Sequence, residues 1–238
     1  MNTYLISEFV RNSWNGCLEL FYPNLCICCE ARCFSAEQIF CLDCQSQLPP
    51  SEMYQFAENE FTLKFKGRIP LHKGAALFYY QKGSRLQLAM ERLKYKNEPD
   101  IGISLGSYFA DRLYQNPFIE ALDLILPVPL HPSRERIRGY NQSAMIARGF
   151  SEISKIPVKE NILLRSKETK SQIDKNRMER IDNMQSVFEV RQAEKIENKH
   201  LLLIDDILTT GATLEACALQ LLKTAPCKIS MLTIGMTC

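Results

Sequence analysis

Strand-like and helix-like patterns of apolar residues alternate along the chain from about residue 74 onward. Short apolar runs predict strands at 75–80, 122–130, 162–164, 187–190, 201–204 and 229–234. Apolar residues recur at helical spacing over 86–93, 101–113, 141–153 and 214–222. Alternating strands and helices favour a parallel sheet that helices cover on both faces, with ligands at the carboxyl ends of the strands. We therefore expect an α/β domain over residues 74–238.

The first 73 residues follow other patterns. Near the N-terminus, helical spacing predicts an amphipathic helix that packs on the rest of the protein, with an apolar face of Ile6, Phe9, Val10, Trp14, Cys17, Leu18 and Phe21. A cysteine-rich stretch follows, and it has few other apolar residues that could build a core. Pro49, Pro50 and the polar run to Glu60 are typical of a linker. These patterns predict a helix and a small module over residues 1–50 and a linker over 51–73.

Seven of the ten cysteines lie in the first 44 residues. They include two Cys-x-x-Cys pairs, Cys26 with Cys29 and Cys41 with Cys44, which are separated by eleven residues. Two such thiolate pairs, brought together by a loop, are typical of a tetrahedral zinc site. A shell of four sulfurs leaves no open position for a substrate, so the predicted zinc is structural and stabilises a segment with a small core.

Two further cysteines leave the ligand set open. Cys28 is an alternative to either member of the first pair, and Cys33 competes with them. A redox pair of the thioredoxin type is a weaker interpretation, because neither pair begins a helix after a predicted strand. Disulfides are disfavoured, because the N-terminus lacks a secretion-signal pattern and the cytosol keeps thiols reduced. We therefore expect a zinc module in a cytoplasmic protein.

The composition is that of an ordinary soluble globular protein. Of the 238 residues, 46% are hydrophobic and 24% are charged, and the net charge is +2. These values exclude a disordered, collagenous or coiled-coil chain, and the near-neutral charge argues against bulk packaging of nucleic acid. The longest apolar stretches, such as 201–204, are far shorter than a membrane-spanning helix, so no membrane insertion is expected.

The segment 201–213 has the most specific chemical pattern. A buried apolar strand is followed by the adjacent carboxylates Asp205 and Asp206, and then by a Thr/Gly/Ala loop that leads into a helix. The backbone N–H groups of such a loop and helix start attract a phosphate, and threonine hydroxyls donate to its oxygens. The carboxylates suit either the hydroxyl groups of a ribose or Mg²⁺. A sugar phosphate is therefore the expected ligand.

Other interpretations of this segment lack supporting motifs. The loop does not end in Gly-Lys-Ser/Thr, so it is not a P-loop, and no strand is followed by the Gly-x-Gly-x-x-Gly of a dinucleotide site. A magnesium-binding strand of the nucleotidase type would need a phosphate loop that the chain lacks. An ordinary surface Asp-Asp pair is common, but the complete order of strand, carboxylates, Thr-Thr-Gly-x-Thr and helix is not.

The segment 201–213 resembles the phosphoribosyl-pyrophosphate (PRPP) loop of type I phosphoribosyltransferases, and the whole chain resembles the ComF family of competence-associated proteins. The resemblance rests on an ordered series of motifs: the cysteine pairs, 93–96, 127–130, 138–142, Arg165, Thr169, Gln172, Arg180, Asn183 and the PRPP-type loop. Tyr140 stands where the family more often has Phe, and Ser171 stands where Pro often precedes the Gln. Cys28 and Cys33 are additional to the family pattern.

The resemblance implies a parallel sheet of the type I phosphoribosyltransferase kind, flanked by helices and preceded by a four-cysteine zinc module. It implies that PRPP, accompanied by Mg²⁺, binds at Asp205, Asp206, Thr209, Thr210, Gly211, Ala212 and Thr213. The pyrophosphate is expected to face three arginines after the strand at 122–130, namely Arg134, Arg136 and Arg138. Type I enzymes commonly close a mobile loop over the pyrophosphate, and residues 165–183 are either that loop or a solvated segment.

Two functions follow from these features. One is transfer of a phosphoribosyl group from PRPP, although the sequence offers no convincing general base, since His72, His131 and His200 are scattered. The alternative, which the resemblance to a competence-associated family implies, is a non-catalytic role in DNA uptake, in which the same fold binds single-stranded DNA and the zinc module docks a competence helicase. Residues 130–182 hold 12 Lys and Arg against 7 Asp and Glu, a net charge of +5 that suits pyrophosphate or DNA. Base stacking would fall to Tyr95, Tyr140 and Phe150.

Overall fold

The computed structural model describes residues 23–35, 38–165 and 187–237. The helix expected in the first 21 residues and most of the expected loop over 165–183 lie outside this range. The chain divides into two units, residues 1–49 and 50–238, which we describe separately. Within the described residues, none of the helices combines the length and the apolar character needed to cross a membrane.

The smaller unit is built from turns around its cysteines. An antiparallel bridge joins Leu25 to Arg32, and one short helix, α2 (Leu42–Ser46), begins directly after Cys41. The side chain of Asn24 fastens two turns by donating to the carbonyls of Ser35 and Gln38, both at 2.7 Å. Buried apolar side chains other than cysteine are few among its described residues: Ile27, Phe40 and Leu48. Hydrophobic burial alone therefore gives this unit little stability.

The larger unit contains a four-stranded parallel sheet in the order β1-β6-β5-β2. Its strands are β1 (Leu71–Tyr80), β2 (Leu124–Pro127), β5 (His200–Leu208) and β6 (Lys228–Thr237). The two central strands, β5 and β6, are buried along nearly their whole length. Because all four strands are parallel, their carboxyl ends meet at one edge of the sheet, and three connections leave from that edge.

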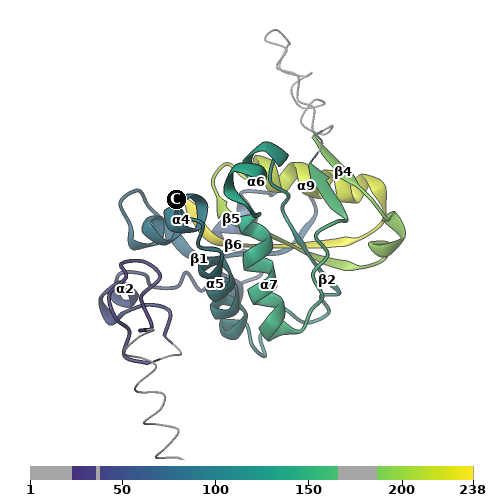
Figure 1. Ribbon diagram of the computed structural model, residues 1–238. Helices are drawn as coiled ribbons and strands as arrows, with labels where there is room; N and C mark the ends of the chain where they lie inside the picture. Colours follow the sequence, from purple (N-terminus) through teal and green to yellow (C-terminus); the bar gives the residue numbers. More distant parts are fainter. Residues whose placement is uncertain (1–22, 36–37, 166–186, 238) are drawn as a thin grey trace, which may run out of the picture. The chain divides into compact units, whose positions relative to one another are not determined.

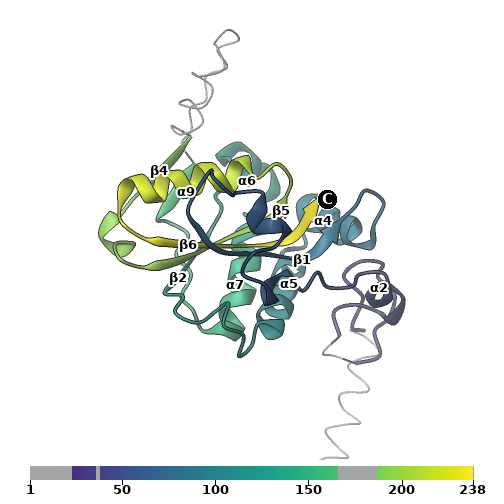
Figure 2. The same ribbon diagram turned by 180° about the vertical axis from the view of Figure 1, so that it is seen from behind.

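Helices cover both faces of this sheet, as expected. Helices α5 (Pro99–Arg112) and α7 (Gln142–Ser154) lie on one side, and α9 (Ala212–Thr224) lies on the other (Figures 1 and 2). Helix α4 (Arg85–Tyr95) follows β1. Helices α5 and α7 approach so closely that a Cβ atom on Gly149 would lie 2.0 Å from the carbonyl oxygen of Ile103. Helix α7 also packs on β5 and β2.

The segment expected to be a linker, 51–73, is part of the larger unit. It forms the 3₁₀ turn η1 (Met53–Gln55), helix α3 (Glu60–Leu63) and the start of β1. Phe61 and Phe65 are fully buried, and the amide of Asn59 donates to the carbonyl of Gly74 at 2.9 Å. The expectation was wrong because the residues around these phenylalanines are mostly polar, so the apolar pattern gives no sign that the two rings are buried.

Other elements differ from the expectation in extent or pairing. Strands β3 (Leu163–Arg165) and β4 (Phe188–Val190) form a separate antiparallel pair, because a short apolar run does not reveal which sheet it joins. Strand β2 ends at Pro127, since prolines cannot donate to the ladder, and the expected loop after it contains helix α6 (Pro132–Arg138). Strand β5 continues through both carboxylates to Leu208. A 3₁₀ turn, η2 (Ala193–Lys195), completes the larger unit's described elements.

Candidate functional site

The four cysteines predicted as zinc ligands lie together in the smaller unit. The Sγ atoms of Cys26, Cys29, Cys41 and Cys44 all lie within 4.8 Å of one another, and those of Cys29 and Cys41 are 3.6 Å apart. Zn–S bonds of ~2.3 Å in a tetrahedron place the sulfurs ~3.8 Å apart, so the cluster has the dimensions that zinc requires. Among the residues that the structure describes, no other group of three or more ligating side chains comes together.

The two additional cysteines are buried but lie outside this cluster. Burial raises the pKa of Cys28 to about 12, and the neighbouring Cys26 and Cys29 act in the same direction. Burial also acts to raise the pKa of Cys26, but backbone N–H groups, chiefly that of Cys41, donate to its sulfur and lower the pKa to about 7. Burial and the neighbouring cysteines also raise the pKa of Cys44, a member of the cluster, so the ligand set rests on the positions of the four sulfurs and not on these pKa shifts.

The paired carboxylates lie on β5 and reach side chains of two other elements. The hydroxyl of Ser143, at the start of α7, donates to Asp205 Oδ1 at 2.8 Å. The ammonium of Lys94, in the last turn of α4, lies 2.8 Å from Asp206 Oδ2. The backbone N–H of Asp206 also donates to Asp205 Oδ1, at 2.9 Å. Asp205 Oδ2 has no hydrogen-bond partner among the described residues, so it is the carboxylate oxygen open to a ligand.

Burial of the carboxyl group, followed by repulsion from Asp206, raises the pKa of Asp205 to about 7. The hydrogen bonds from Ser143 and from the Asp206 backbone, and the charge of Lys94, act in the opposite direction but do not cancel the rise. An ordinary aspartate has a pKa of about 3.9. The folded state therefore retains this proton where the unfolded chain has lost it, and stability falls as the pH rises from about 4 through about 7.

Asp205→Asn is expected to stabilise the fold, and more so at pH 8 than at pH 5. The amide oxygen still accepts from Ser143, while the variant removes a buried charge that repels Asp206. Thermal unfolding of both proteins at the two pH values measures the effect, with Asp111→Asn on the exposed surface of α5 as a control. A melting temperature that changes equally at both pH values would contradict the raised pKa.

The expected phosphate loop joins β5 to α9. Thr209, Thr210 and Thr213 are exposed, and Gly211 precedes the first residue of α9 with φ of 80°, the left-handed region that favours glycine. A Cβ atom on Gly211 would lie 3.0 Å from the ring of Phe65, which is tighter than ordinary packing. The loop thus combines exposed hydroxyls with the free N–H groups of a helix start, the groups that bind a phosphate.

Arg68 supports this loop, and the sequence analysis missed it because it lies in the expected linker. Its guanidinium donates to the carbonyl of Lys64 at 2.9 Å and to that of Thr210 at 3.5 Å. It also pairs with Glu215 in the first turn of α9 and lies 5.7 Å from the centre of the Phe65 ring. The segment before β1 therefore holds the loop in shape and adds a cation beside it.

The motif at 138–142 connects α6 to α7, and its side chains make structural contacts beside the site. The Tyr140 hydroxyl donates to the carbonyl of Leu93 in α4. The Asn141 side chain caps α7 and donates to the carbonyl of Val128 after β2, at 3.0 Å. These contacts bring the ends of α4 and β2 together beside Asp205 and Asp206. Tyr140 and Asn141 therefore use these donors to hold the protein itself.

The three arginines predicted to face pyrophosphate have different surroundings. Arg134 and Arg136 are exposed on α6. Arg138 is half-buried, donates to Gln142, and lies 5.7 Å from the centre of the Tyr95 ring. Arg138 therefore packs the connection between α6 and α7, whereas the other two are open to solvent. Of the aromatics expected to stack on bases, Phe150 is fully buried in the core and Tyr95 is 77% exposed.

Comparison with known proteins agrees with this geometry. A family model described as phosphoribosyl transferase domain matches residues 117–235. Competence protein F of Haemophilus influenzae is 27% identical, over 85% of this chain and 93% of that protein. Competence protein ComFC of Bacillus subtilis is 28% identical, over 67% of this chain and 62% of that protein. DNA utilization protein YhgH of Escherichia coli O157:H7 is 25% identical, over 58% of this chain and 61% of that protein.

The matched region contains β2, the carboxylates on β5 and the loop that leads into α9. The relatives that match most of the chain extend the similarity into the segment before β2. The expected fold, a parallel sheet flanked by helices, is also confirmed. Because the family model spans half of the chain and the relatives carry the ComF name, this chain belongs to the phosphoribosyl transferase domain family and is a ComF family protein.

Proposed function

We propose that the carboxyl edge of the sheet binds PRPP together with Mg²⁺. The observation that carries the proposal is the position of Asp205 and Asp206: two elements hold them in place, and the phosphate-type loop lies immediately beyond them. Asp205, with one carboxylate oxygen open, accepts the ribose hydroxyls or holds Mg²⁺, for which carboxylate oxygens are suitable ligands. Thr209, Thr210, Gly211, Ala212 and Thr213 bind the 5′-phosphate.

The pyrophosphate of this ligand lies toward α6. Arg134 and Arg136 are exposed there, on the connection that leaves the strand next to β5. Guanidinium groups bind phosphate oxygens in a bidentate manner, so these two arginines are the ones we assign to the pyrophosphate. Arg138 orders their helix through Gln142 and Tyr95. This assignment narrows the three predicted arginines to two that contact the ligand and one that positions them.

If the bound PRPP reacts, a nucleophile attacks its anomeric carbon and the bond to the pyrophosphate oxygen breaks, with the electron pair leaving on pyrophosphate. Stabilising that leaving charge is the contribution that this site can make. The three histidines already have partners within the protein: His200 bonds Ser230 at 2.9 Å, the ring of His131 accepts from the Ser133 backbone, and His72 lies edge-on to the His200 ring at 4.8 Å. The acceptor must then arrive as a competent nucleophile or bring its own base.

The relatives named for competence and DNA utilization support a role for this chain in the uptake or use of DNA.

In the smaller unit, we propose that Cys26, Cys29, Cys41 and Cys44 hold one structural zinc ion. Such a site closes all four coordination positions and supplies folding energy rather than chemistry. The expected docking of a competence helicase on this unit stays a proposal.

Ligand-dependent protection against heat tests the PRPP proposal. A ligand that binds only the folded state stabilises it by RT ln(1 + [L]/Kd), so PRPP at about 100 times its Kd adds about 2.7 kcal/mol. We expect PRPP with Mg²⁺ to raise the melting temperature by several degrees. Omitting Mg²⁺ should remove most of the rise, and an unchanged melting temperature at millimolar PRPP would refute the proposal.

A second candidate function, binding of single-stranded DNA, is favoured by the surface of α6. Arg134 and Arg136 lie there beside Ile137, which is 87% exposed, and Tyr95 is exposed nearby. Cations that follow a backbone, with aromatic rings for the bases, are typical of single-strand binding. The DNA would use the same face as pyrophosphate, so the two ligands should compete.

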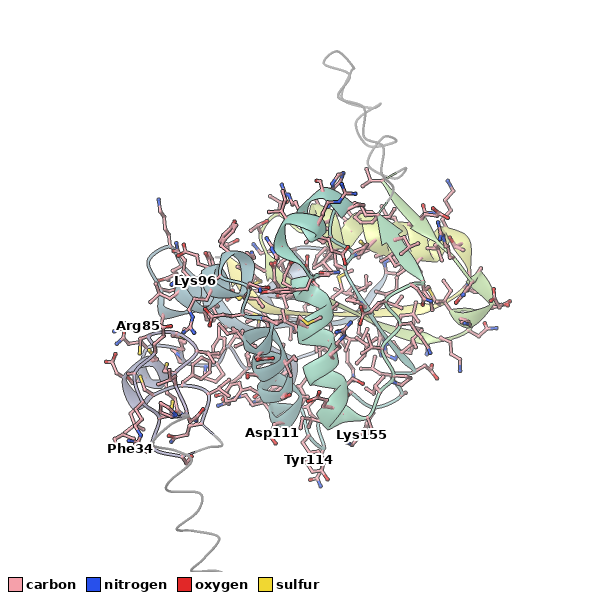
Figure 3. All side chains as sticks on the ribbon, in the orientation of Figure 1. Phe34, Arg85, Lys96, Asp111, Tyr114 and Lys155 are labelled. Carbon is pink, nitrogen blue, oxygen red and sulfur yellow. The ribbon has the colours of Figure 1, made fainter. Side chains whose placement is uncertain are left out.

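Arg134→Gln with Arg136→Gln is expected to weaken binding of a single-stranded oligonucleotide and to flatten its salt dependence. Each phosphate contact adds about 0.7 to the slope of log K against log salt. Fluorescence anisotropy over a range of salt concentrations measures both effects. Lys155→Gln with Lys159→Gln is the control with the same change of charge. Lys155 lies at the end of α7 (Figure 3), and Lys159 lies beside Ile125 of β2. Equal losses in both double variants, or no binding by the wild type at low salt, would exclude this surface.

A further inference from the structure

The Lys94 side chain is mostly buried, which is unusual for a lysine. It lies in the last turn of α4, and its ammonium is 2.8 Å from Asp206 Oδ2. The side chains of Lys94 and Asp206 are only 22% and 11% exposed. Withdrawing an ammonium from water is costly unless it is paired, and ordering its long side chain costs further entropy. The site thus keeps a fixed cation beside its carboxylates, and neither the composition nor the loop motif assigns it a role.

The residues on either side of Lys94 hold the end of α4 in place. On the residue before it, the Leu93 carbonyl accepts from the Tyr140 hydroxyl, and on the residue after it, the Tyr95 ring lies 5.7 Å from the Arg138 guanidinium. Arg138 is the last residue of α6, and Tyr140 lies in the turn between α6 and α7. The end of α4 is therefore tied to the segment that follows β2. Lys94 thus contacts Asp206, while the residues on either side of it contact this segment.

The hydrogen bonds around the two carboxylates leave Lys94 with capacity for a ligand. Asp206 accepts from the Ile207 N–H at Oδ1 and pairs with Lys94 at Oδ2, so both of its oxygens are engaged. An ammonium has three N–H donors, and this ion pair uses one of them. The groups left open here are therefore Asp205 Oδ2, an acceptor, and the remaining donors of Lys94.

We propose that Lys94 determines the preference of the site for a pyrophosphorylated ribose phosphate, by bridging Asp206 and the pyrophosphate of the ligand. The ribose hydroxyls donate hydrogen bonds to the Asp205 carboxylate, while the Lys94 ammonium donates to the oxygens of the pyrophosphate. Asp206 acts as the anchor that aims the ammonium. Ribose 5-phosphate lacks the pyrophosphate, so it gains nothing from Lys94. This inference rests on the proposed PRPP function and adds a specificity-determining residue to it.

The test compares two ligands on three proteins by calorimetric titration in the presence of Mg²⁺. Lys94→Gln removes the charge but keeps a donor for Asp206, and Lys96→Gln removes an exposed charge two residues away, at the end of α4 (Figure 3). We expect Lys94→Gln to weaken PRPP binding roughly tenfold or more, as loss of a charge-assisted hydrogen bond implies, and ribose 5-phosphate binding by less than about threefold. Lys96→Gln should leave both affinities near those of the wild type.

Equal losses for the two ligands in Lys94→Gln, or an equal loss of PRPP binding in Lys96→Gln, would overturn the inference while leaving the PRPP function standing. Failure of the wild type to bind PRPP would overturn both. A measurement on the wild-type chain covers the case in which Lys94→Gln does not fold. PRPP, and not ribose 5-phosphate, should protect Lys94 from acylation, read by mass spectrometry against Lys96. Equal protection by both ligands, or by neither, would also overturn the inference.

Discussion

Replacing both carboxylates, as Asp205→Asn with Asp206→Asn, is expected to lower the affinity for Mg–PRPP by about a hundredfold or more. Each charge-assisted hydrogen bond contributes about 1.5–3 kcal/mol. The double variant weakens the contact of Asp205 with the ribose or its Mg²⁺, and it removes the charge of Asp206 that holds the Lys94 ammonium in place. Asparagine keeps the size and the acceptor oxygens, so the bonds from Ser143 and the Ile207 backbone can still form. The affinity is measured by calorimetric titration of PRPP.

This variant separates a loss of binding from a loss of folding. Asp205→Asn removes a charge that the raised pKa marks as unfavourable, whereas Asp206→Asn deprives the Lys94 ammonium of its charged partner. The two effects oppose each other, so we expect a folded variant whose melting temperature at pH 8 lies within about 5 °C of that of the wild type. The matched control is Asp111→Asn on α5, which removes a carboxylate far from β5 (Figure 3). Wild-type affinity in the folded double variant would contradict the assigned site.

Loss of metal is expected to unfold the smaller unit. Isolated zinc peptides gain about 10–16 kcal/mol from metal binding at neutral pH, which exceeds the stability of most domains. This unit has only three buried apolar side chains besides cysteine among its described residues, so little else holds it. Chelation should therefore expose residues 23–48 to hydrogen exchange and proteolysis. The four-stranded sheet, which has its own core, should keep its protection.

Single substitutions then identify the ligands. Cys44→Ser should lower the zinc content well below one ion per chain and reproduce the effect of the chelator, because serine is a poor zinc ligand. Cys28→Ser and Cys33→Ser are the matched controls, since both side chains are buried outside the cluster. They should keep the full zinc content, measured by atomic absorption. Retention of zinc in Cys44→Ser together with its loss in Cys28→Ser would show that the four-sulfur cluster is not the metal site.

Local patterns in the sequence were enough to predict the parts of the site that are continuous in the chain. The cysteine pairs came together as predicted, because each pair lies in one turn and the connecting loop is short. The strand, carboxylates, loop and helix at 201–213 also keep their predicted order, because each step is set by neighbouring residues. All four strands of the parallel sheet were predicted, although the predicted and observed strands differ in length.

The local patterns do not predict contacts between segments that are far apart in the sequence. The pairing of Lys94 with Asp206 depends on the strand order, which places β1 and β2 at opposite edges of the sheet and lets α4 reach β5. Arg68 supports the phosphate loop from a segment that looked like a linker. Arg138 looked equivalent to Arg134 and Arg136, and only its contact with Tyr95 distinguishes it. Apolar periodicity carries no information on strand order, so none of these contacts could be read from it.

The most direct test of the account is a calorimetric titration of PRPP into the zinc-loaded wild-type protein, with and without Mg²⁺. We predict saturable binding with one ligand per chain in the presence of Mg²⁺, and binding at least tenfold weaker when Mg²⁺ is replaced by a chelator that spares the zinc. Absence of binding in a folded, zinc-loaded sample would contradict the PRPP site at Asp205 and Asp206. The loop between β5 and α9 would then be only a feature of the fold, and binding of single-stranded DNA at the surface of α6 would become the leading proposal.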